Sequence, residues 1–433
     1  MKCPNILYIH SHDTGRYVQP YGYAIPAPNI QRLAEQGVLF RQAFCAAPTC
    51  SPSRASLLTG QCAHASGMLG LAHRGFSLHD YKQHIVHTLR TRGYYSALVG
   101  VQHIARDPSV IGYDRIAEVE NHRADQVVPA AVDLLSRVPK QPFFLSVGFL
   151  ETHREFHSPG SQEDARYCLP PHPLPDTPEI RQDMAAFKSS ARVLDRGVGA
   201  VLNALDGNGL AENTLVICTT DHGIAFPGMK CNLTDHGIGV MLIMRGPGGF
   251  TGGQVCDAMV SQIDLFPTIC DLLGIEPPAW LEGKSLMPLI QGKTEQINDQ
   301  IFAEVTYHAA YEPQRAVRTR RWKYIRRFDD RARLVLPNCD DSLSKDVWLE
   351  HGWRDHCLAS EELYDLIFDP NEAHNLATDP SRKAVLNEMR GRLERWMQAT
   401  HDPLLRGPVP APPGARVNDP DGLSPREPRR VVF

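Results

Sequence analysis

The sequence lacks any apolar run long enough to cross a bilayer. A membrane-spanning helix needs roughly 18 or more consecutive apolar residues, and the strongest candidates, such as residues 143–150, have only the length of a strand. The chain passes directly into the strand-like segment 5–10, without the apolar segment and small-residue cleavage site of a signal peptide. We therefore expect no membrane partner and a cytoplasmic location.

Strong net charge and a dense cysteine pattern are also absent. The 45 Lys and Arg residues nearly balance the 49 Asp and Glu residues and are spread along the chain, so no nucleic-acid partner is expected. The 11 cysteines do not follow the regular spacing of a secreted disulfide scaffold, so most are expected to be reduced thiols. The sequence shows no internal repeat.

The 433 residues, 42% of them hydrophobic and 22% charged, have the composition of a soluble globular protein. Short apolar runs alternate with longer helical patterns. We predict strands at residues 6–9, 95–99, 143–149, 215–218 and 240–244, and helices at 124–138 and 178–205. This alternation predicts an α/β fold, with a doubly wound, mostly parallel sheet flanked by helices.

The pattern changes after about residue 300. An alternating basic and aromatic segment, 318–325, predicts antiparallel strands, with its basic side chains on a solvated face of an edge strand. A helix is predicted at about 381–399, and 8 prolines follow in residues 403–433. We predict an α/β domain at 1–298, a smaller α+β domain with an antiparallel sheet at 299–402, and a proline-rich tail at 403–433. The tail lies against the body, lies against a neighbouring subunit of a homodimer or higher oligomer, or is mobile.

Polar side chains follow four of the predicted strands. They are His10, His12 and Asp13 after the first strand, His103 after the second, Glu151 and His153 after the third, and Asp221 and His222 after the fourth. A single such residue is most often a helix cap or a surface group. The carboxyl ends of strands in an open α/β sheet converge, however, and mixed carboxylates and imidazoles suit a divalent cation. The oxygen ligands favour calcium, magnesium or manganese over structural zinc.

Residues 50–60, Cys-Ser-Pro-Ser-Arg-Ala-Ser-Leu-Leu-Thr-Gly, place a cysteine just before a helical pattern. A helix N-terminus favours an anion, and Arg54 adds a positive charge. From the residues alone, Cys50 is either a nucleophilic thiol of low pKa beside an oxyanion site or a buried cysteine in a turn.

This segment resembles the signature of the type I sulfatases, the formylglycine-dependent sulfatases of the alkaline phosphatase superfamily. Further segments that resemble the family are 4–7, 28–33, 220–223, 264–268, 362–365 and 375–376. Segments 223–227, 375–380 and 400–403 resemble the heparan N-sulfatase (sulfamidase) branch in particular.

The resemblance implies a hydrolase of sulfate esters or sulfamates, acting on a small sugar or aryl substrate. It implies that a formylglycine-generating enzyme converts Cys50 to formylglycine, and that one divalent ion is bound, most simply Ca²⁺, with Mg²⁺ or Mn²⁺ as alternatives. One hydroxyl of the hydrated aldehyde would attack sulfur, and deprotonation of the other would release sulfate.

The resemblance also assigns roles to single residues. The metal ligands would be Asp13, Asp221, His222 and the modified Cys50. Arg54 would steady the formylglycine, His103 would act as the base, His153 would protonate the leaving group or hold the sulfate, and Lys230 would bind sulfate. Glu304 and His308 follow a predicted strand at 301–303 and are candidate substrate contacts.

The sequence departs from the family pattern at two places. Family members carry two consecutive acidic residues where this chain has His12 and Asp13, so His12 either ligates the metal or lines the site. The usual Gly-Lys-x-His is here Gly-Val-Gln-His at 100–103. The loss of that cation removes stabilisation of a charged transition state unless Gln102 or Arg106 compensates.

The second departure keeps two alternatives open. One is a formylglycine-dependent phosphodiesterase or phosphonate monoester hydrolase, and the other is a catalytically silent relative that binds sulfated ligands. The long loops that would set specificity, such as 151–175 and 329–357, have no conformation that the sequence reveals.

Overall fold

The computed structural model describes residues 3–137 and 140–432. Its centre is an eight-stranded sheet of order β4-β3-β5-β1-β6-β7-β2-β8. The strands are β1 (Asn5–Ser11), β2 (Val38–Phe44), β3 (Tyr95–Gly100), β4 (Arg115–Ile116), β5 (Phe143–Gly148), β6 (Thr214–Thr220), β7 (Leu242–Arg245) and β8 (Gln254–Ser261). Among these strands β7 alone runs antiparallel to its neighbours, so the predicted mostly parallel sheet is confirmed.

Alternate residues of β1 enter two different hydrophobic cores. Ile6 and Tyr8 belong to the core on one face of the sheet, and Leu7 and Ile9 to the core on the other face. Every position of β1 is buried, as expected when helices cover both faces of a parallel sheet.

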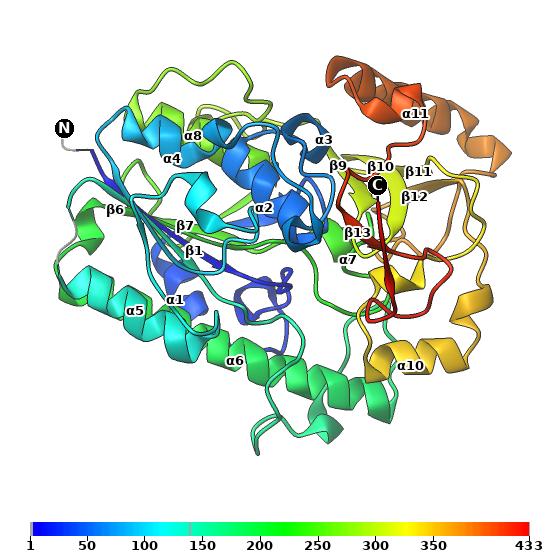
Figure 1. Ribbon diagram of the computed structural model, residues 1–433, viewed down its shortest axis with the longest axis horizontal. Coiled ribbons are helices and arrows are strands. Elements are labelled where there is room, and N and C mark those ends of the chain that lie inside the picture. The colour runs from blue at the N-terminus through cyan, green and yellow to red at the C-terminus, as the bar shows by residue number, and fades with distance from the viewer. Residues whose placement is uncertain (1–2, 138–139, 433) are drawn as a thin grey trace.

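The helices lie in two layers, one on each side of the sheet (Figure 1). One layer contains α2 (Cys50–Thr59), α4 (Ile85–Arg90) and α8 (Leu265–Leu273), and the other contains α1 (Pro28–Gln36), α5 (Ala124–Ser136) and α6 (Pro178–Gly207). The remaining α-helices are α3 (Ala63–Ser66), α7 (Asp235–Ile238), α9 (Met287–Ile290), α10 (Leu343–Glu350) and α11 (Lys383–Ala399). Both helices predicted for this part of the chain are confirmed, except that residue 138, the predicted end of the first, lies outside the described residues.

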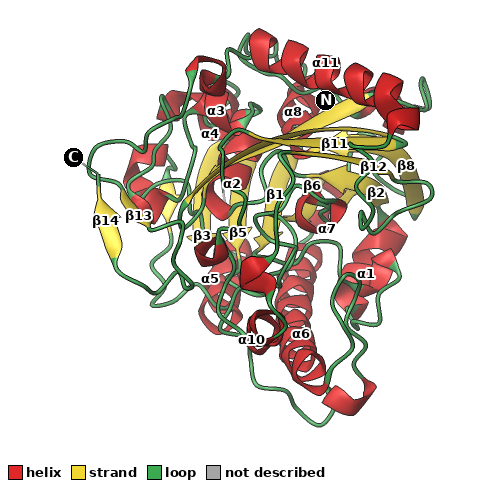
Figure 2. Ribbon diagram, turned by 90° about the vertical axis from the view of Figure 1, so that its right-hand side faces the viewer, coloured by secondary structure: helices red, strands yellow, loops and turns green. Residues whose placement is uncertain are grey.

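A second sheet follows along the chain, antiparallel and of order β12-β11-β10-β9 (Figure 2). Its strands are β9 (Gln300–Tyr307), β10 (Tyr311–Thr319), β11 (Trp322–Arg327) and β12 (Glu361–Asp365). Helix α11 packs on this sheet through Leu386, Met389, Leu393 and Met397. The predicted antiparallel sheet and C-terminal helix are thus confirmed. The other face shares a hydrophobic core with the large sheet, so the domain boundary at residue 298 stays a prediction.

The predicted solvated basic face is wrong for the edge strand and for Arg318 and Lys323, whereas Arg320 and Arg321 of the same segment are exposed. Strands β10 and β11 lie in the interior of the second sheet, and Arg318 and Lys323 are buried. Arg318 Nη2 lies 2.8 Å from Asp235 Oδ2, and Lys323 Nζ lies 2.8 Å from Glu372 Oε1. Carboxylates from α7 and from the loop after β12 neutralise these cations and allow their burial.

The proline-rich tail lies against the body, which was one of its three predicted placements. Ala411 and Ala415 join the shared core, and the side-chain oxygen of Asn418 accepts a hydrogen bond of 2.7 Å from Arg74. The tail also contains the short strands β13 (Arg416–Asn418) and β14 (Arg429–Val431). No helix in the described part of the chain is long and apolar enough to cross a membrane. All 11 cysteines lie in the described ranges and none forms a disulfide.

We expect Arg315→Met to destabilise the fold strongly. The Arg315 guanidinium is fully buried, with Nε 2.6 Å from Asp402 Oδ2 and Nη2 3.2 Å from Glu304 Oε2. Removing it leaves two buried carboxylates without their cation, which costs about 3–5 kcal/mol. Urea unfolding measures this loss. The control Arg320→Met changes an exposed residue in the turn between β10 and β11 and is expected to shift stability by about 0.5 kcal/mol at most. Equal effects of the two variants would contradict the expectation.

Candidate active site

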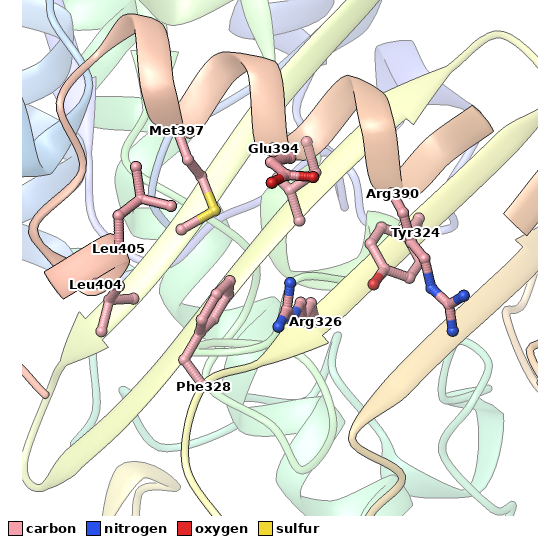
Figure 3. Close-up of a pocket in the computed structure, with 9 residues that line it drawn as sticks. Tyr324, Arg326, Phe328, Arg390, Glu394, Met397, Leu404 and Leu405 are labelled. Carbon is pink, nitrogen blue, oxygen red and sulfur yellow. The ribbon is translucent and has the colours of Figure 1, made fainter. Parts of the chain in front are cut away.

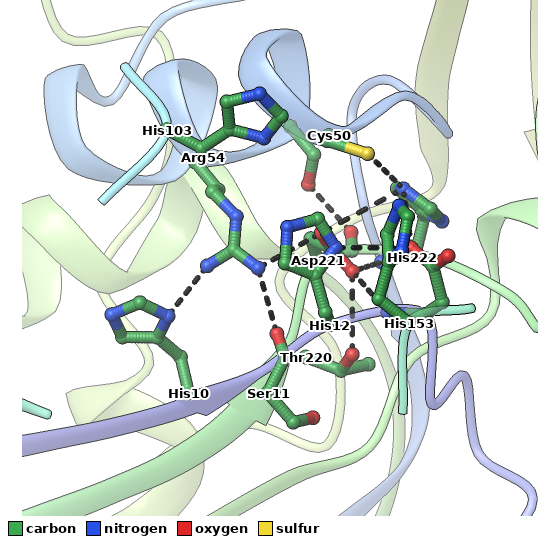
Figure 4. A network of polar contacts seen from close by, with 12 residues as sticks. His10, Ser11, His12, Cys50, Arg54, His103, His153, Thr220, Asp221 and His222 are labelled. Carbon is green, nitrogen blue, oxygen red and sulfur yellow. Dashed lines mark hydrogen bonds and ion pairs between the residues drawn. The ribbon is translucent and has the colours of Figure 1, made fainter. Parts of the chain in front are cut away.

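Cys50 is the first residue of α2 and is 2% exposed. Helix α2 begins after Thr49, which has extended backbone angles, and Pro52 occupies its first turn, where a missing N–H costs no helical hydrogen bond. The Cys50 Sγ lies 3.4 Å from His222 Nε2 (Figure 4). The predicted position of this cysteine at a helix N-terminus is confirmed.

The ends of β1 and β6 bring two carboxylates and two imidazoles together beside Cys50. His12 Nδ1 lies 3.1 Å from Asp13 Oδ1 and 3.0 Å from Asp221 Oδ2. His222 Nε2 lies 3.4 Å from Asp13 Oδ1 and 3.7 Å from Asp221 Oδ2. Ligand atoms of His12, Asp13, Cys50 and Asp221 all lie within 4.8 Å of one another. These converging donors fit one divalent cation.

Backbone strain occurs after β1 and after β3. Asp13 has a φ of 50° and His103 a φ of 54°, in the left-handed region that non-glycine residues rarely adopt. The amide of Asp13 donates to Asp221 Oδ1 at 2.8 Å, which holds the turn after β1 against the end of β6. Such strain persists where surrounding contacts fix the conformation, and it concentrates at functional sites.

Arg54, one turn after Cys50 on α2, holds Asp221 and the end of β1 in position. Its Nη2 donates to Asp221 Oδ2 at 2.9 Å and to the Ser11 carbonyl at 2.8 Å. Its Nη1 lies 2.5 Å from His10 Nδ1. Burial and the neighbouring Arg54 hold the pKa of His10 well below its usual value, so His10 accepts this hydrogen bond as a neutral imidazole.

Lys230 and His153 also contact the cluster. Lys230 Nζ lies 2.9 Å from Asp13 Oδ2 and 2.9 Å from Asp340 Oδ2. The His153 ring packs edge-on against His12, with centroids 4.9 Å apart. Although burial opposes ionisation, Lys230, His12 and His222 hold the pKa of the Cys50 thiol well below its usual value. The site therefore stabilises an anion at position 50.

His103 and His308 lie next to Cys50 and have unused hydrogen-bonding capacity. Burial lowers the pKa of each imidazole, and in both cases the Cys50 side chain opposes that shift. Within the described chain, the Nδ1 atoms of His103 and His308 are buried without a hydrogen-bond partner. Unpaired buried nitrogens are costly, which favours a polar ligand at this position.

Two predicted substrate contacts lie elsewhere. The Glu304 carboxylate accepts from His64 and pairs with Arg315 in a separate buried cluster. The Gln102 side chain folds its own loop, because Oε1 accepts from the amides of Ile104 and Ala105. Arg106, the other candidate replacement for the missing lysine, is exposed. The expected roles of Gln102 and Glu304 at the site are therefore not supported by their positions.

The structure adds two residues that the sequence did not reveal. His73 Nδ1 lies 2.8 Å from His103 Nε2, with the two rings stacked. Burial and the neighbouring His103 lower the pKa of His73 to about 4, so His73 contacts the site as a neutral imidazole. Asp340 comes from the loop between β11 and α10, and the only sequence signal for it was the length of that loop.

A surface pocket elsewhere in the molecule contains none of the candidate residues. It lies between α11 and the second sheet and is lined by Tyr324, Phe328, Arg390 and Met397 among others (Figure 3). This pocket is therefore separate from the candidate active site, whose residues lie at the carboxyl edge of the large sheet.

Comparisons with known proteins agree with this geometry. The family model described as Sulfatase matches residues 4–275, and the model described as N-sulphoglucosamine sulphohydrolase, C-terminal, matches residues 229–340. Human N-sulphoglucosamine sulphohydrolase is 31% identical over 443 residues, which cover 89% of this chain and 88% of the relative. An ulvan-active sulfatase from Formosa agariphila is 28% identical and covers 98% of this chain and 86% of its own length.

A solved structure shows the same fold. It is a protein in complex with its substrate D-glucosamine-2-N,6-O-disulfate, and it aligns with a TM-score of 0.75 at 17% identity over 94% of this chain and 99% of that chain. The Sulfatase family model covers more than half of the sequence, from β1 to the end of α8. The chain therefore belongs to the sulfatase family and is a sulfuric ester or sulfamate hydrolase, close to sulfamidase.

Proposed function

We propose that this sulfatase removes sulfate from a sulfated amino sugar, at nitrogen or oxygen, after Cys50 has been converted to formylglycine. The observation that carries the proposal is the position of Cys50. It is buried at the N-terminus of α2, next to two carboxylates and several imidazole side chains. The 31% identity to a human N-sulphoglucosamine sulphohydrolase supports an amino sugar as the substrate.

The proposed metal ligands are Asp13, Asp221 and His222, with His12 close enough to join them. The carboxylate oxygens favour a hard cation, and we propose Ca²⁺. The bound cation would neutralise developing charge on the sulfuryl oxygens. Arg54 keeps Asp221 in position, and Lys230 does the same for Asp13.

Formylglycine, once hydrated, would supply the hydroxyl that attacks sulfur. His103 Nδ1 is placed to accept a proton at position 50, and His73 orients the ring through Nε2. Lys230 and His308 are placed to bind sulfuryl oxygens. The His153 ring packs edge-on against His12, and we propose that it protonates the leaving group.

The substrate proposal is tested with a panel of four compounds: glucosamine N-sulfate, glucosamine 6-O-sulfate, an aryl sulfate and an aryl phosphonate monoester. We expect kcat/KM for a sulfated amino sugar to exceed that for the phosphonate by at least about 10²-fold. The reason is that an active site complementary to the transition state of sulfuryl transfer stabilises that of phosphonate hydrolysis less well.

One observation favours the second candidate function, phosphonate or phosphodiester hydrolysis. The family lysine is replaced by Val101, which is 6% exposed, and the structure supplies no charged substitute from Gln102 or Arg106. Comparable turnover of the phosphonate and the sulfates would support this candidate. Turnover of none of the four by formylglycine-bearing protein would favour a silent sulfate-binding relative.

Metal removal is expected to abolish activity and lower the melting temperature. Chelation leaves the Asp13 and Asp221 carboxylates close together without a divalent cation between them. A metal ion at a concentration of 100 times its Kd raises the free energy of unfolding by about 2.7 kcal/mol. Activity and Tm are measured after chelation and after stepwise addition of Ca²⁺, Mg²⁺ or Mn²⁺. The control Asp221→Asn should gain little Tm from any ion. Full activity of chelated, metal-free protein would contradict the proposal.

His308→Gln is expected to lower kcat/KM by about 10–10²-fold, because the change replaces the buried imidazole next to Cys50 with an amide whose polar atoms occupy other positions. His84→Gln is the matched control, since His84 is also buried but is the N-cap of α4, where its Nδ1 accepts a hydrogen bond from the Val86 amide. Steady-state kinetics on equal amounts of folded protein separate the two. Loss of activity in both variants to the same extent would indicate a packing effect.

A further inference from the structure

A second cluster of metal-ligating side chains lies outside the site around Cys50. It consists of Cys62 and His64, at the start of α3, Glu304 from β9, and Glu282 from the loop between α8 and α9, and we call it the Cys62 cluster. Cys62 is 3%, His64 6% and Glu304 1% exposed, while Glu282 is only partly buried. The sulfatase reaction uses none of these residues.

Three distances between ligand atoms of the cluster are close to those of a tetrahedral metal site, and Cys62 Sγ lies 3.4 Å from the other His64 ring nitrogen, Nε2. Cys62 Sγ lies 3.6 Å from His64 Nδ1 and 3.4 Å from Glu282 Oε1, and His64 Nδ1 lies 2.9 Å from Glu304 Oε1. A tetrahedral zinc ion with Zn–S of about 2.3 Å and Zn–N or Zn–O of about 2.0 Å holds its ligand atoms about 3.3–3.6 Å apart. An ion therefore fits after small side-chain shifts.

The donor types select the metal. A thiolate, an imidazole and carboxylates form a mixed set that suits zinc, whereas calcium and magnesium take oxygen ligands. This set differs from the site around Cys50, where carboxylates dominate once the cysteine has been oxidised. The two sites would thus prefer different ions.

Surrounding contacts orient these ligands, as they do in established metal sites. The backbone amide of His64 donates to Glu304 Oε1 at 3.0 Å, and Arg315 Nη2 lies 3.2 Å from Glu304 Oε2. The amide of Cys62 donates to Glu282 Oε2 at 3.2 Å. Burial and the carboxylates of Glu304 and Glu282 raise the pKa of the Cys62 thiol, so the site has a negative potential that a cation would relieve.

We propose that Cys62, His64, Glu304 and Glu282 bind a structural zinc ion. Zinc forms bonds to Cys62 Sγ, to His64 Nδ1 and to one oxygen of each glutamate. The Cys62 S–H bond breaks and its proton passes to solvent, together with the proton of His64 when that imidazole is charged. No electron transfer is involved. The ion would tie the segment after α2 to β9, and so join the two sheets.

Cobalt titration tests the proposal with a readout independent of activity. The starting protein is the full-length Cys50→Ala variant, because removing that thiol leaves only sulfur-free ligands at the catalytic site. We expect Co²⁺ to produce a thiolate-to-cobalt charge-transfer band and the intense visible bands of a tetrahedral site. Zn²⁺ should displace Co²⁺ and erase both.

Three further variants are compared in the same Cys50→Ala protein. Adding Cys62→Ala should remove the charge-transfer band, whereas adding Cys270→Ala, which changes another buried thiol, should leave it intact. Glu282→Gln, at the partly exposed ligand, should fold normally and bind Co²⁺ at least 10-fold more weakly. If Cys62→Ala fails to fold, the weakening in Glu282→Gln decides. No charge-transfer band in Cys50→Ala, or a band that survives Cys62→Ala, would overturn the proposal, as would unchanged affinity in Glu282→Gln.

Discussion

Replacing Cys50 with alanine is expected to abolish sulfatase turnover, with a fall in kcat of at least about 10⁴-fold. Alanine removes the side chain that would become formylglycine and leaves the metal ligands in place. The fold should survive, because a thiol is a weak hydrogen-bonding group and the distance from Sγ to His222 Nε2 is 3.4 Å. Steady-state kinetics on the best substrate of the panel, with Tm measured alongside, separate chemistry from stability.

Cys270→Ala is the matched control for this prediction. Cys270 is also buried, 1% exposed, but it packs in α8 among apolar side chains. It should lose some stability and keep its kcat. Cys50→Ser replaces the thiol with a hydroxyl, which cannot form the aldehyde by thiol oxidation, and so tests the modification itself. Peptide mass analysis of active wild-type protein should show formylglycine at position 50, and fully active protein with an intact cysteine there would contradict the mechanism.

The sequence predicted the site well where strand order alone determines position. Asp13, His103, His153 and Asp221 each follow a strand of the parallel sheet by one to five residues, and parallel strands deliver their carboxyl ends to one edge. Cys50 was equally predictable, because its motif forms a helix start. Strands β2 and β8 escaped the prediction since their exposed positions interrupt the apolar runs.

The contributions of loops were not predictable. Asp340 and His73 reach the site from segments whose paths depend on tertiary contacts, such as the hydrogen bond of Arg74 to Asn418 in the tail. Glu304 was misplaced for a related reason. It lies inside β9 rather than after a strand end, and its carboxylate pairs with His64 and Arg315 instead of facing Cys50.

Val101 stands where the family pattern has a lysine, so the site has one positive charge fewer to stabilise the transition state. His73 contacts His103, but burial and His103 lower its pKa to about 4, so it brings no charge at neutral pH. The proposed sulfate-binding cation is Lys230, which two carboxylates hold. We therefore expect stabilisation of the transition-state charge to depend on Lys230 more heavily here than in a relative that carries both lysines.

Lys230→Met is accordingly expected to lower kcat/KM by about 10²–10³-fold, the loss typical of one transition-state donor. Methionine keeps the length and the apolar stem of the side chain while it removes the ammonium group. The change also leaves Asp13 and Asp340 without their shared partner, from which each Oδ2 is 2.9 Å away. Activity must therefore be expressed per folded molecule, with the folded fraction taken from urea unfolding.

Lys323→Met provides a control that matches burial and charge. Lys323 is fully buried and also lies between two carboxylates, Asp235 and Glu372, but it belongs to β11 of the second sheet. Breaking either buried pair costs about 3–5 kcal/mol, so both variants should lose stability to a similar extent. Only Lys230→Met should lose kcat/KM per folded molecule. If Lys323→Met loses as much, the effect of Lys230 is structural, and binding of the sulfuryl group then falls to His308 and the metal.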